Sequence, residues 1–268
     1  SGSSSPKIST NSVLKLNLAG ELPDMSIDDP FSNFNPLSGS FSSEPIIGLK
    51  DLKLILKAAA KDDKIKAIWL NTDNLTAMPA NMMDLVSELI KFKESGKLIY
   101  AYSNSLSEQS ILVNSVADKS YINPVGHAEF NGMSSEIMYY TGLLEKLKIQ
   151  PMIFYAGEFK SATEPFRLKS ISPENKLQVE TYLNSIYNNY LGKLSQLRKI
   201  PVDSLKSIAN NLDVFMAEDA LKYKLIDGLK YEDEVEEELK AKFGYDKDAS
   251  LKLVSLKSYK SSVDLDDD

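Results

Sequence analysis

Hydrophobic and polar residues follow one another along this chain with two different periods, one typical of strands and one typical of helices. Short apolar or alternating runs predict strands at 13–18, 65–70, 98–102, 120–122, 152–155 and 225–228. Apolar residues at helical spacing predict helices at 48–61, 82–92, 107–117, 138–147, 173–199, 217–223 and 232–243. Because helices and strands take turns, we expect an α/β fold with mostly parallel strands.

Several boundaries of these elements can be placed from single residues. Ser172 before Pro173 is a typical N-cap for the long helix that follows. A turn is expected at 123–126, where Asn and Pro precede Val and Gly. The acidic helix at 232–243 is read most simply as a solvated face.

Composition removes several classes of function. The net charge is −7 and the 31 Lys and Arg residues are dispersed, so we expect no nucleic-acid partner. The chain has no cysteine and one histidine, so any metal site would consist of oxygen ligands. We expect neither a metal nor a cofactor.

The single histidine, His127, invites a Ser-His-Asp triad, but the chain has no Gly-x-Ser-x-Gly nucleophile elbow. No Gly-rich phosphate loop is present either. His127 is therefore interpreted as an ordinary loop residue.

Lys160 is the strongest candidate for chemistry. It follows the predicted strand 152–155, and α/β folds place functional groups at the carboxyl ends of strands. A lysine acts as a general base near neutral pH only if burial lowers its pKa from about 10.4 to roughly 7–8. The carboxylates of Glu158 and Glu164 must then point away from the amine, since a nearby negative charge raises the pKa.

The segment around Lys160 resembles a known family. The stretch from Tyr139 to Phe166, with Gly157-x-Phe-Lys160-Ser-Ala-x-Glu-Pro-Phe166, is similar to signal peptide peptidase A, the protease IV family of serine peptidases. The similarity extends through Ala117-Asp118-Lys119 and Ala220-Leu221-x-x-x-Leu225-Ile226-Asp227, and so covers nearly the whole chain.

In the long members of that family, the amino-terminal half carries the general-base lysine, which falls on Lys160. The nucleophilic serine lies in the other half, in an Ala-Ser-Gly-Gly-Tyr segment. The equivalent position here is Glu108, and neither glycine is present. The resemblance therefore implies an amino-terminal half without its own nucleophile, inactive alone, with Ser161 as a residue that orients the lysine amine.

Two neighbouring serines, Ser107 and Ser110, are alternative positions for a displaced nucleophile. A shift of one or two residues would turn the side chain away from a site that needs sub-ångström placement. Both serines are therefore poor candidates.

The same resemblance implies a crotonase/Clp-protease-like fold, a spiral of repeated ββα units with outer helices. Residues 12–245 would form this domain, 1–11 a linker or an artificial remnant, and 246–268 a disordered linker toward a missing carboxy-terminal half. The implied partners are that half, further copies in a bowl-shaped, tetramer-like homo-oligomer, and peptide remnants of cleaved signal peptides. The implied location is the bacterial cytoplasmic membrane, facing the periplasm or the outside, with the anchor not in this chain.

Two other functions remain open. The chain could be a non-catalytic structural or peptide-binding module of the same assembly. It could also be a crotonase-type acyl-CoA enzyme, although residues 71–80 lack the glycine pair that would cradle a thioester carbonyl.

Overall fold

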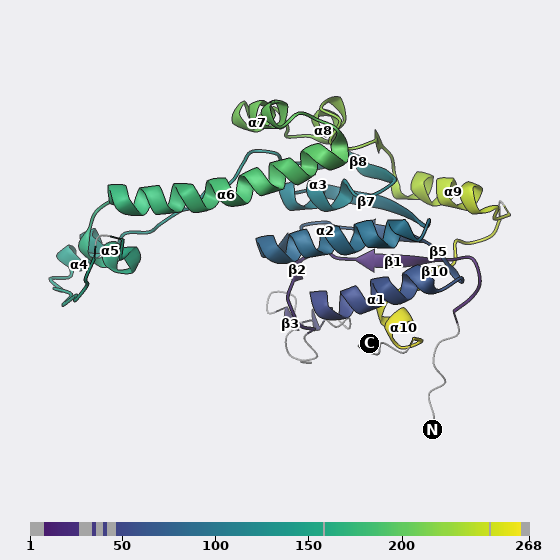
Figure 1. Ribbon diagram of the computed structural model, residues 1–268, viewed down its shortest axis with the longest axis horizontal. Coiled ribbons are helices and arrows are strands. Elements are labelled where there is room, and N and C mark those ends of the chain that lie inside the picture. Colours follow the sequence, from purple (N-terminus) through teal and green to yellow (C-terminus); the bar gives the residue numbers. More distant parts are fainter. Residues whose placement is uncertain are drawn as a thin grey trace, which may run out of the picture. The chain divides into compact units, whose positions relative to one another are not determined.

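The computed structural model describes residues 8–26, 34–35, 40–41, 47–157, 159–246 and 248–263 (Figure 1). Its contacts divide the chain into two units. We call residues 1–131 with 194–268 the sheet unit, and residues 132–193 the insert unit. Each unit is described by itself.

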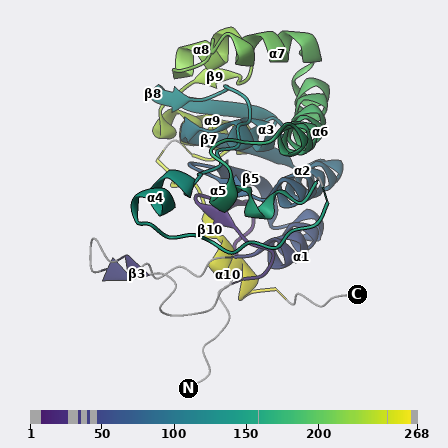
Figure 2. The same ribbon diagram turned by 90° about the vertical axis from the view of Figure 1, so that its left-hand side faces the viewer.

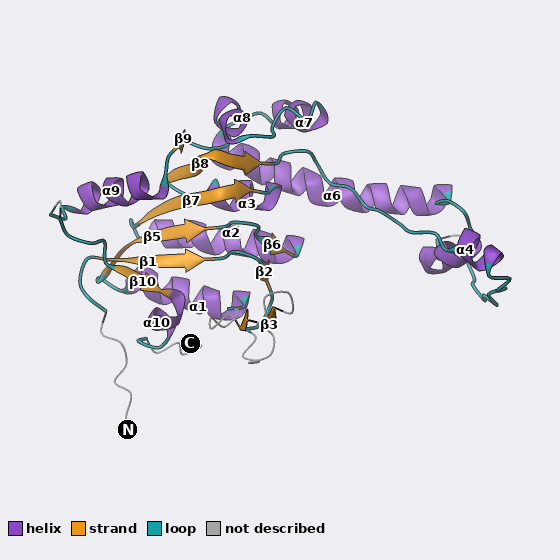
Figure 3. Cartoon of the chain, turned by 180° about the vertical axis from the view of Figure 1, so that it is seen from behind, coloured by secondary structure: helices purple, strands orange, loops and turns teal. Residues whose placement is uncertain are grey.

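The sheet unit is built on six strands that pair in parallel throughout, in the order β10-β1-β5-β7-β8-β9 (Figure 3). The strands are β1 Ser12–Asn17, β5 Ile65–Asn71, β7 Leu98–Leu106, β8 Lys119–Ala128, β9 Gly228–Leu229 and β10 Leu253–Ser255. Because the strands are parallel, their carboxyl ends share one edge of the sheet, which we call the carboxyl edge. The expected parallel α/β architecture is confirmed.

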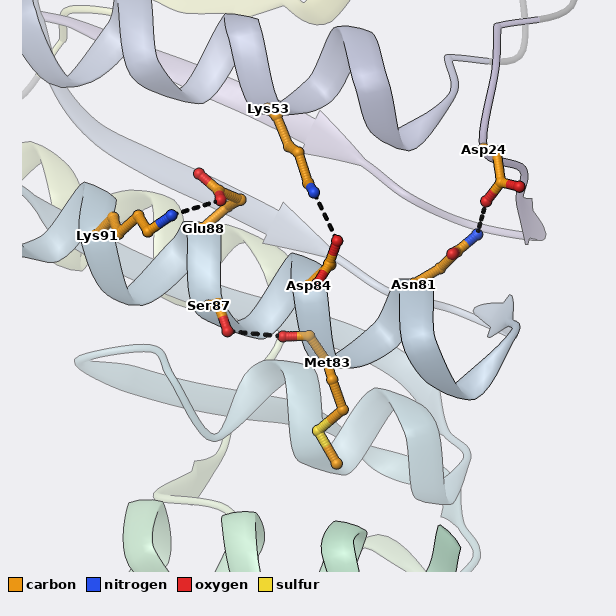
Figure 4. A network of polar contacts seen from close by, with 8 residues as sticks. All are labelled: Asp24, Lys53, Asn81, Met83, Asp84, Ser87, Glu88 and Lys91. Carbon is orange, nitrogen blue, oxygen red and sulfur yellow. Dashed lines mark hydrogen bonds and ion pairs between the residues drawn. The ribbon is translucent and has the colours of Figure 1, made fainter.

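Three helices cover one face of this sheet, namely α1 Leu49–Lys61, α2 Pro79–Glu94 and α3 Glu108–Asn114. Figure 2, which looks nearly along the strands, shows α1 and α2 on the same side of the sheet. Their solvent-facing sides are joined by an ion pair of 2.6 Å between Lys53 and Asp84, and Asn81 donates to Asp24 at 2.6 Å (Figure 4). Such exposed contacts add little stability, so the helices are held chiefly by their buried apolar faces.

The opposite face is covered by α9 Glu232–Phe243. Its Val235 and Leu239 are fully buried in a core with Trp69 and Tyr100. The expectation that this helix is mainly a solvated face is therefore incomplete. Its acidic residues are mostly exposed, but Val235 and Leu239, which lie one helical turn apart, pack against the sheet.

The first two repeats show the ββα order that the crotonase/Clp-protease-like fold implies. Strand β1 is followed by β2 Glu21–Leu22 and α1, and β5 is followed by β6 Thr76–Ala77 and α2. Strands β2 and β6 pair in parallel as a separate two-stranded sheet. A short antiparallel pair, β3 Phe34–Asn35 with β4 Ser40–Phe41, lies between β2 and α1 in the sequence.

Strand β8 differs from the expectation that it ends at a turn over 123–126. It continues to Ala128, with a register shift against β7 between Ser103 and Ser105. A side chain at Gly126 would lie 2.5 Å from the carbonyl oxygen of Asn104, so only glycine permits this close approach of the two backbones.

The carboxy-terminal stretch contains regular structure within the range expected to be a linker. Strand β10 pairs with β1, and helix α10 Leu256–Lys260 follows it directly. Tyr259 donates to Asp62 at 3.1 Å, and Lys260 forms an ion pair with Asp51 at 2.6 Å. The expectations for residues 1–7 and 264–268 lie outside the described residues.

The remaining helices of the sheet unit are α7 Val202–Asn210 and α8 Ala217–Lys222. They follow α6 Pro173–Arg198, which begins in the insert unit and ends in the sheet unit. At that end Arg198 pairs with Asp227 at 3.1 Å. Strand β9 starts at Gly228, and the predicted strand residues Leu225 and Ile226 are instead buried turn residues before it.

The insert unit also contains α4 Thr141–Lys146, the 3₁₀ turn η1 Ser161–Thr163 and α5 Glu164–Arg167. The strand expected at 152–155 is wrong, because residues 151–156 have no regular structure. Met152 and Phe154 are 88% and 90% exposed. An apolar run becomes a strand only beside a sheet that can accept its hydrogen bonds, and no described residue of this unit forms one.

Candidate functional site

Polar side chains gather at the carboxyl edge, where β5 and β7 end. Thr72 donates to the side chain of Asn114 at 2.9 Å, and Asn114 donates to Ser103 at 3.3 Å. All three side chains are buried and hydrogen-bonded. Satisfied buried networks of this kind fix the positions of the loops around them.

Asp73 links two of these loops. Its carboxylate accepts hydrogen bonds from the backbone N–H groups of Asn104 at 2.7 Å and Ser105 at 3.1 Å. These groups lie where the β7–β8 register shifts, so their ladder partners are displaced. Asp73 therefore supplies acceptors that the bulged strand lacks.

Helix α3 begins at the same edge, at the position of the expected nucleophile. Glu108 is its first residue and Ser107 is its N-cap, whose hydroxyl accepts the N–H of Ser110 at 3.2 Å. The hydroxyl of Ser110 is fully buried and donates to the carbonyl oxygen of Thr72 at 2.7 Å. Both hydroxyls are engaged in structural hydrogen bonds.

Gln109, the second residue of α3, was missed by sequence reasoning. Its amide oxygen accepts the N–H of Ala77 at 2.7 Å, and its amide nitrogen donates to the carbonyl oxygen of the same residue at 3.1 Å. A lone glutamine at a helix start carries no sequence signal. Only the folded chain brings α3 beside β6.

Lys160 lies in the insert unit, immediately before η1. Gly157 adopts a positive φ of 95°, and a side chain placed there would lie 3.7 Å from Cγ of Lys160. An open hollow of about 450 Å³ lies at this turn, and three of its lining residues are aromatic. It is lined by Phe154, Tyr155, Ala156, Phe159, Lys160, Ser161, Ala162 and Thr163.

The side chain of Lys160 is exposed. Among the described residues, none forms an ion pair or hydrogen bond with its amine, and Ser161 does not contact it in this way. Glu158 lies outside the described residues. The burial that a lysine base requires is thus not supplied within the described part of the insert unit.

Glu164, in contrast, is fully buried. Its carboxylate accepts from the hydroxyl of Ser172 at 2.5 Å and from the side-chain amide of Asn175 at 2.9 Å. Burial acts to raise the pKa of this carboxyl, but the hydrogen bonds from Ser172 and Asn175 outweigh it and lower the pKa. The carboxylate is therefore held by hydrogen bonds at the start of α6.

Ser172 also confirms the predicted N-cap of α6. Its hydroxyl accepts the N–H of Asn175 at 3.1 Å while donating to Glu164. Thus the Glu-Pro-Phe part of the motif connects the lysine turn to the first turn of α6.

His127 lies near the end of β8, beside Glu129 at 3.0 Å and edge-on to the ring of Phe215 at 4.7 Å. No hydrogen bond to a serine hydroxyl is seen for it among the described residues. Among all the residues that the structure describes, no group of three or more His, Asp or Glu side chains is placed to hold a metal ion. None of the described helices has the length and apolar character needed to cross a membrane.

Comparison with known proteins gives consistent matches. The family model described as peptidase family S49 matches residues 91–246. Protease 4 of Haemophilus influenzae is 27% identical, over 96% of this chain and 43% of that protein. Protease 4 of Salmonella typhi is 29% identical, over 74% of this chain and 34% of that protein.

A plant protein is similar to nearly the same extent. The chloroplastic serine protease SPPA of Arabidopsis thaliana is 26% identical, over 94% of this chain and 35% of that protein. The chain therefore spans less than half the length of each of these three relatives.

Proposed function

Because the chain belongs to peptidase family S49, we propose that it is the amino-terminal half of a two-half serine peptidase and that Lys160 is the general base. Its similarity to three proteins named as proteases supports a peptidase function over an acyl-CoA enzyme. In this proposal residues 12–245 form the amino-terminal half.

The observation that carries the proposal is that this chain has the lysine of the dyad but no serine at the position expected for the nucleophile. The lysine motif Gly157-x-Phe-Lys160-Ser is retained, whereas the first residue of α3, where the serine is expected, is Glu108. Ser107 and Ser110 have structural hydrogen bonds. A serine must then come from the other half, in the same chain or in a neighbouring one.

The chemistry follows from a Ser-Lys dyad. The neutral amine of Lys160 removes the proton of the serine hydroxyl while the serine oxygen attacks the peptide carbonyl. The ammonium then returns the proton to the leaving amine as the C–N bond breaks. In the second step Lys160 takes a proton from water while the water oxygen attacks the ester carbonyl. The ammonium then returns this proton to the serine oxygen as the C–O bond breaks, which frees the acid product and regenerates the serine hydroxyl and the neutral amine. Ser161 orients the lysine amine.

Such a base needs a dry environment, and the insert unit has features that favour its burial by a partner. Aromatic side chains that line the same hollow as Lys160 are largely exposed, with Phe154 at 90%, Tyr155 at 55% and Phe159 at 52%. Exposed apolar clusters of this kind mark interaction surfaces in soluble proteins. We propose that the other half or another copy covers this surface and thereby desolvates Lys160.

The finer parts of the proposal rest on the family resemblance. The substrates are extended, apolar peptide remnants of cleaved signal peptides, and the assembly is a bowl-shaped, tetramer-like homo-oligomer. It works at the bacterial cytoplasmic membrane and faces the periplasm or the outside. This chain alone hydrolyses neither esters nor peptides, because it has no nucleophile.

Replacing Lys160 by alanine in the full-length protein tests the base assignment. General acid–base catalysis contributes typically 10²–10⁴-fold, so kcat for an ester or peptide substrate should fall by at least about a hundredfold. The measurement is the initial rate at saturating substrate, with assembly checked by sedimentation.

Lys146→Ala is the matched control, because this lysine is exposed on α4 of the same unit. It should retain the full rate. Undiminished hydrolysis by Lys160→Ala would remove the base assignment and favour the non-catalytic module instead.

A further inference from the structure

Strand β6 has one backbone edge that is not used by its partner strand. Thr76 faces β2 and donates to the carbonyl oxygen of Gly20 at 2.8 Å. Backbone groups of successive strand residues point in opposite directions, so those of Ala77 face the other edge. We call this the outer edge of β6.

Gln109 occupies that outer edge in a distinctive way. Its amide accepts from the N–H of Ala77 and donates to the carbonyl oxygen of Ala77, at 2.7 Å and 3.1 Å. Two residues of an antiparallel sheet that face each other as a hydrogen-bonded pair exchange this same set of two bonds. The glutamine side chain thus takes the place of one residue of an added antiparallel strand.

Ser107, the N-cap of the same helix, also bonds to the outer edge of β6. The hydroxyl of Ser107 donates to the carbonyl oxygen of Leu75 at 3.5 Å, a long bond. The N–H of Leu75 is already bonded to Thr72, and Pro79 has no N–H to offer. The outer edge therefore offers three backbone groups, one from Leu75 and two from Ala77, and α3 together with its N-cap Ser107 contacts all three.

We propose that the outer edge of β6 is a docking site for an extended peptide, and that Gln109 holds it closed as an internal substitute for the peptide backbone. A peptide binds antiparallel to β6 when the amide of Gln109 swings away. Met78, which is 68% exposed directly beyond Ala77, is placed to contact an apolar side chain of that peptide.

An extended peptide is the occupant because its main chain supplies the donor and acceptor that the glutamine amide now supplies. Peptide recognition by strand addition takes its affinity from such main-chain bonds. The choice of a peptide rests on the proposed peptidase function, whereas the closure by Gln109 rests on the hydrogen bonds alone. The site lies beside Glu108, so in this half a peptide would be bound without being cut.

The test compares peptide binding by the 268-residue chain and its Gln109→Ala variant. The probe is a fluorescein-labelled acetyl-Ala-Leu-Thr-Leu-Ala-amide, followed by fluorescence anisotropy. Removing the competing amide frees two backbone groups, so the Kd should fall by about tenfold. The backbone N–H of Ala77, followed by NMR, should shift on adding the peptide.

Two controls make the result specific. The same peptide N-methylated at its three central residues cannot donate to β6 and should gain nothing from the variant. Gln196→Ala removes an exposed glutamine of α6 and should bind like the unchanged chain. Gln109→Asn, one methylene shorter, keeps a polar amide at the helix start and should move the Kd in the same direction as Gln109→Ala.

Gln109 would be only a tether between α3 and β6 if both Gln109 variants keep the fold and bind no more tightly than the unchanged chain. Equal gains for the parent and N-methylated peptides would likewise overturn the proposal. Because the readout is binding, neither result depends on hydrolysis by the full-length protein. Failure here and failure of the Lys160 assignment are therefore distinguishable.

Discussion

The residue whose environment is most sharply defined in the insert unit is Glu164. It is fully buried and accepts hydrogen bonds from Ser172 and Asn175 at the start of α6. A guanidinium nitrogen of Arg167 lies 3.9 Å from it. A buried carboxylate with these partners stabilises the fold only while it is ionised.

We therefore expect acid to destabilise the insert unit through Glu164. The pKa of this carboxyl is lower in the folded chain than its unfolded value of roughly 4.3. Its contribution is fully present above that value and is lost as the pH falls through the folded pKa. Thermal unfolding between about pH 3 and 7 should show a smaller pH dependence in Glu164→Gln than in the unchanged chain.

The same substitution should lower the free energy of unfolding at neutral pH by about 1–3 kcal/mol, because the replacement amide cannot accept as many hydrogen bonds in the buried site. Glu180→Gln is the matched control, since Glu180 is exposed on α6 of the same unit. An unchanged pH profile in Glu164→Gln would contradict this role of Glu164.

At the scale of elements, α9 is attached to the sheet by polar contacts of Glu238 as well as by its apolar pair. Glu238 accepts from the hydroxyl of Tyr100 at 3.1 Å and from that of Tyr121 at 2.9 Å, and also pairs with Lys230. Burial, and then the charge of Glu238, raise the pKa of Tyr100 to about 12. Both tyrosine hydroxyls therefore remain protonated donors at physiological pH.

Glu238→Ala should loosen α9 without unfolding the sheet. It leaves the hydroxyls of two buried tyrosines without their acceptor, which costs about 1–3 kcal/mol. Backbone amides of α9 should exchange with deuterium roughly tenfold faster or more, while those of β5 and β7 change little. Glu237→Ala is the control and should leave exchange unaltered, because Glu237 is exposed and pairs with Lys240 of the same helix. Equal exchange in both variants would show that the apolar pair alone holds the helix.

At the scale of the whole molecule, the two units differ in how far their apolar side chains are exposed. In the sheet unit most apolar residues of the strands are buried, whereas in the insert unit Met152, Phe154 and Leu177 are more than half exposed. Leu143 and Leu147 of the predicted apolar helix face are exposed as well. The insert unit thus has an apolar surface that a partner can cover.

Phe154→Asp is expected to weaken self-association of the full-length protein. A charge placed in a covered apolar surface is strongly unfavourable, so the sedimentation coefficient should shift toward smaller species at equal concentration. Val125→Asp, which changes a 77% exposed valine of the sheet unit, should leave the distribution unchanged. Identical sedimentation of the Phe154 variant and the unchanged protein would exclude this surface from the assembly contacts.

The extent to which the sequence predicted this protein follows from the range of the interactions involved. Helical spacing and caps act over a few residues, so α1, α2, α6 and the N-cap Ser172 could be predicted from local pattern alone. The motif around Lys160 identified the family for the same reason, since it is a contiguous run of residues.

Features that depend on distant segments could be found only in the tertiary structure. The apolar run 152–155 is not a strand, because strand formation requires neighbours that the local sequence does not specify. Strand β10 joins β1 across the length of the chain, which no local pattern indicates.

The candidate site likewise has some features that the sequence determined and others that only the tertiary structure decided. The sequence by itself determined that a lysine motif is present and that Glu108 stands where a serine is expected. Only the tertiary structure brought Gln109 to Ala77, engaged Ser107 and Ser110, and left Lys160 exposed. The physical reason is that residue identity fixes which groups are available, whereas burial and hydrogen-bond partners depend on segments that meet only when the chain folds.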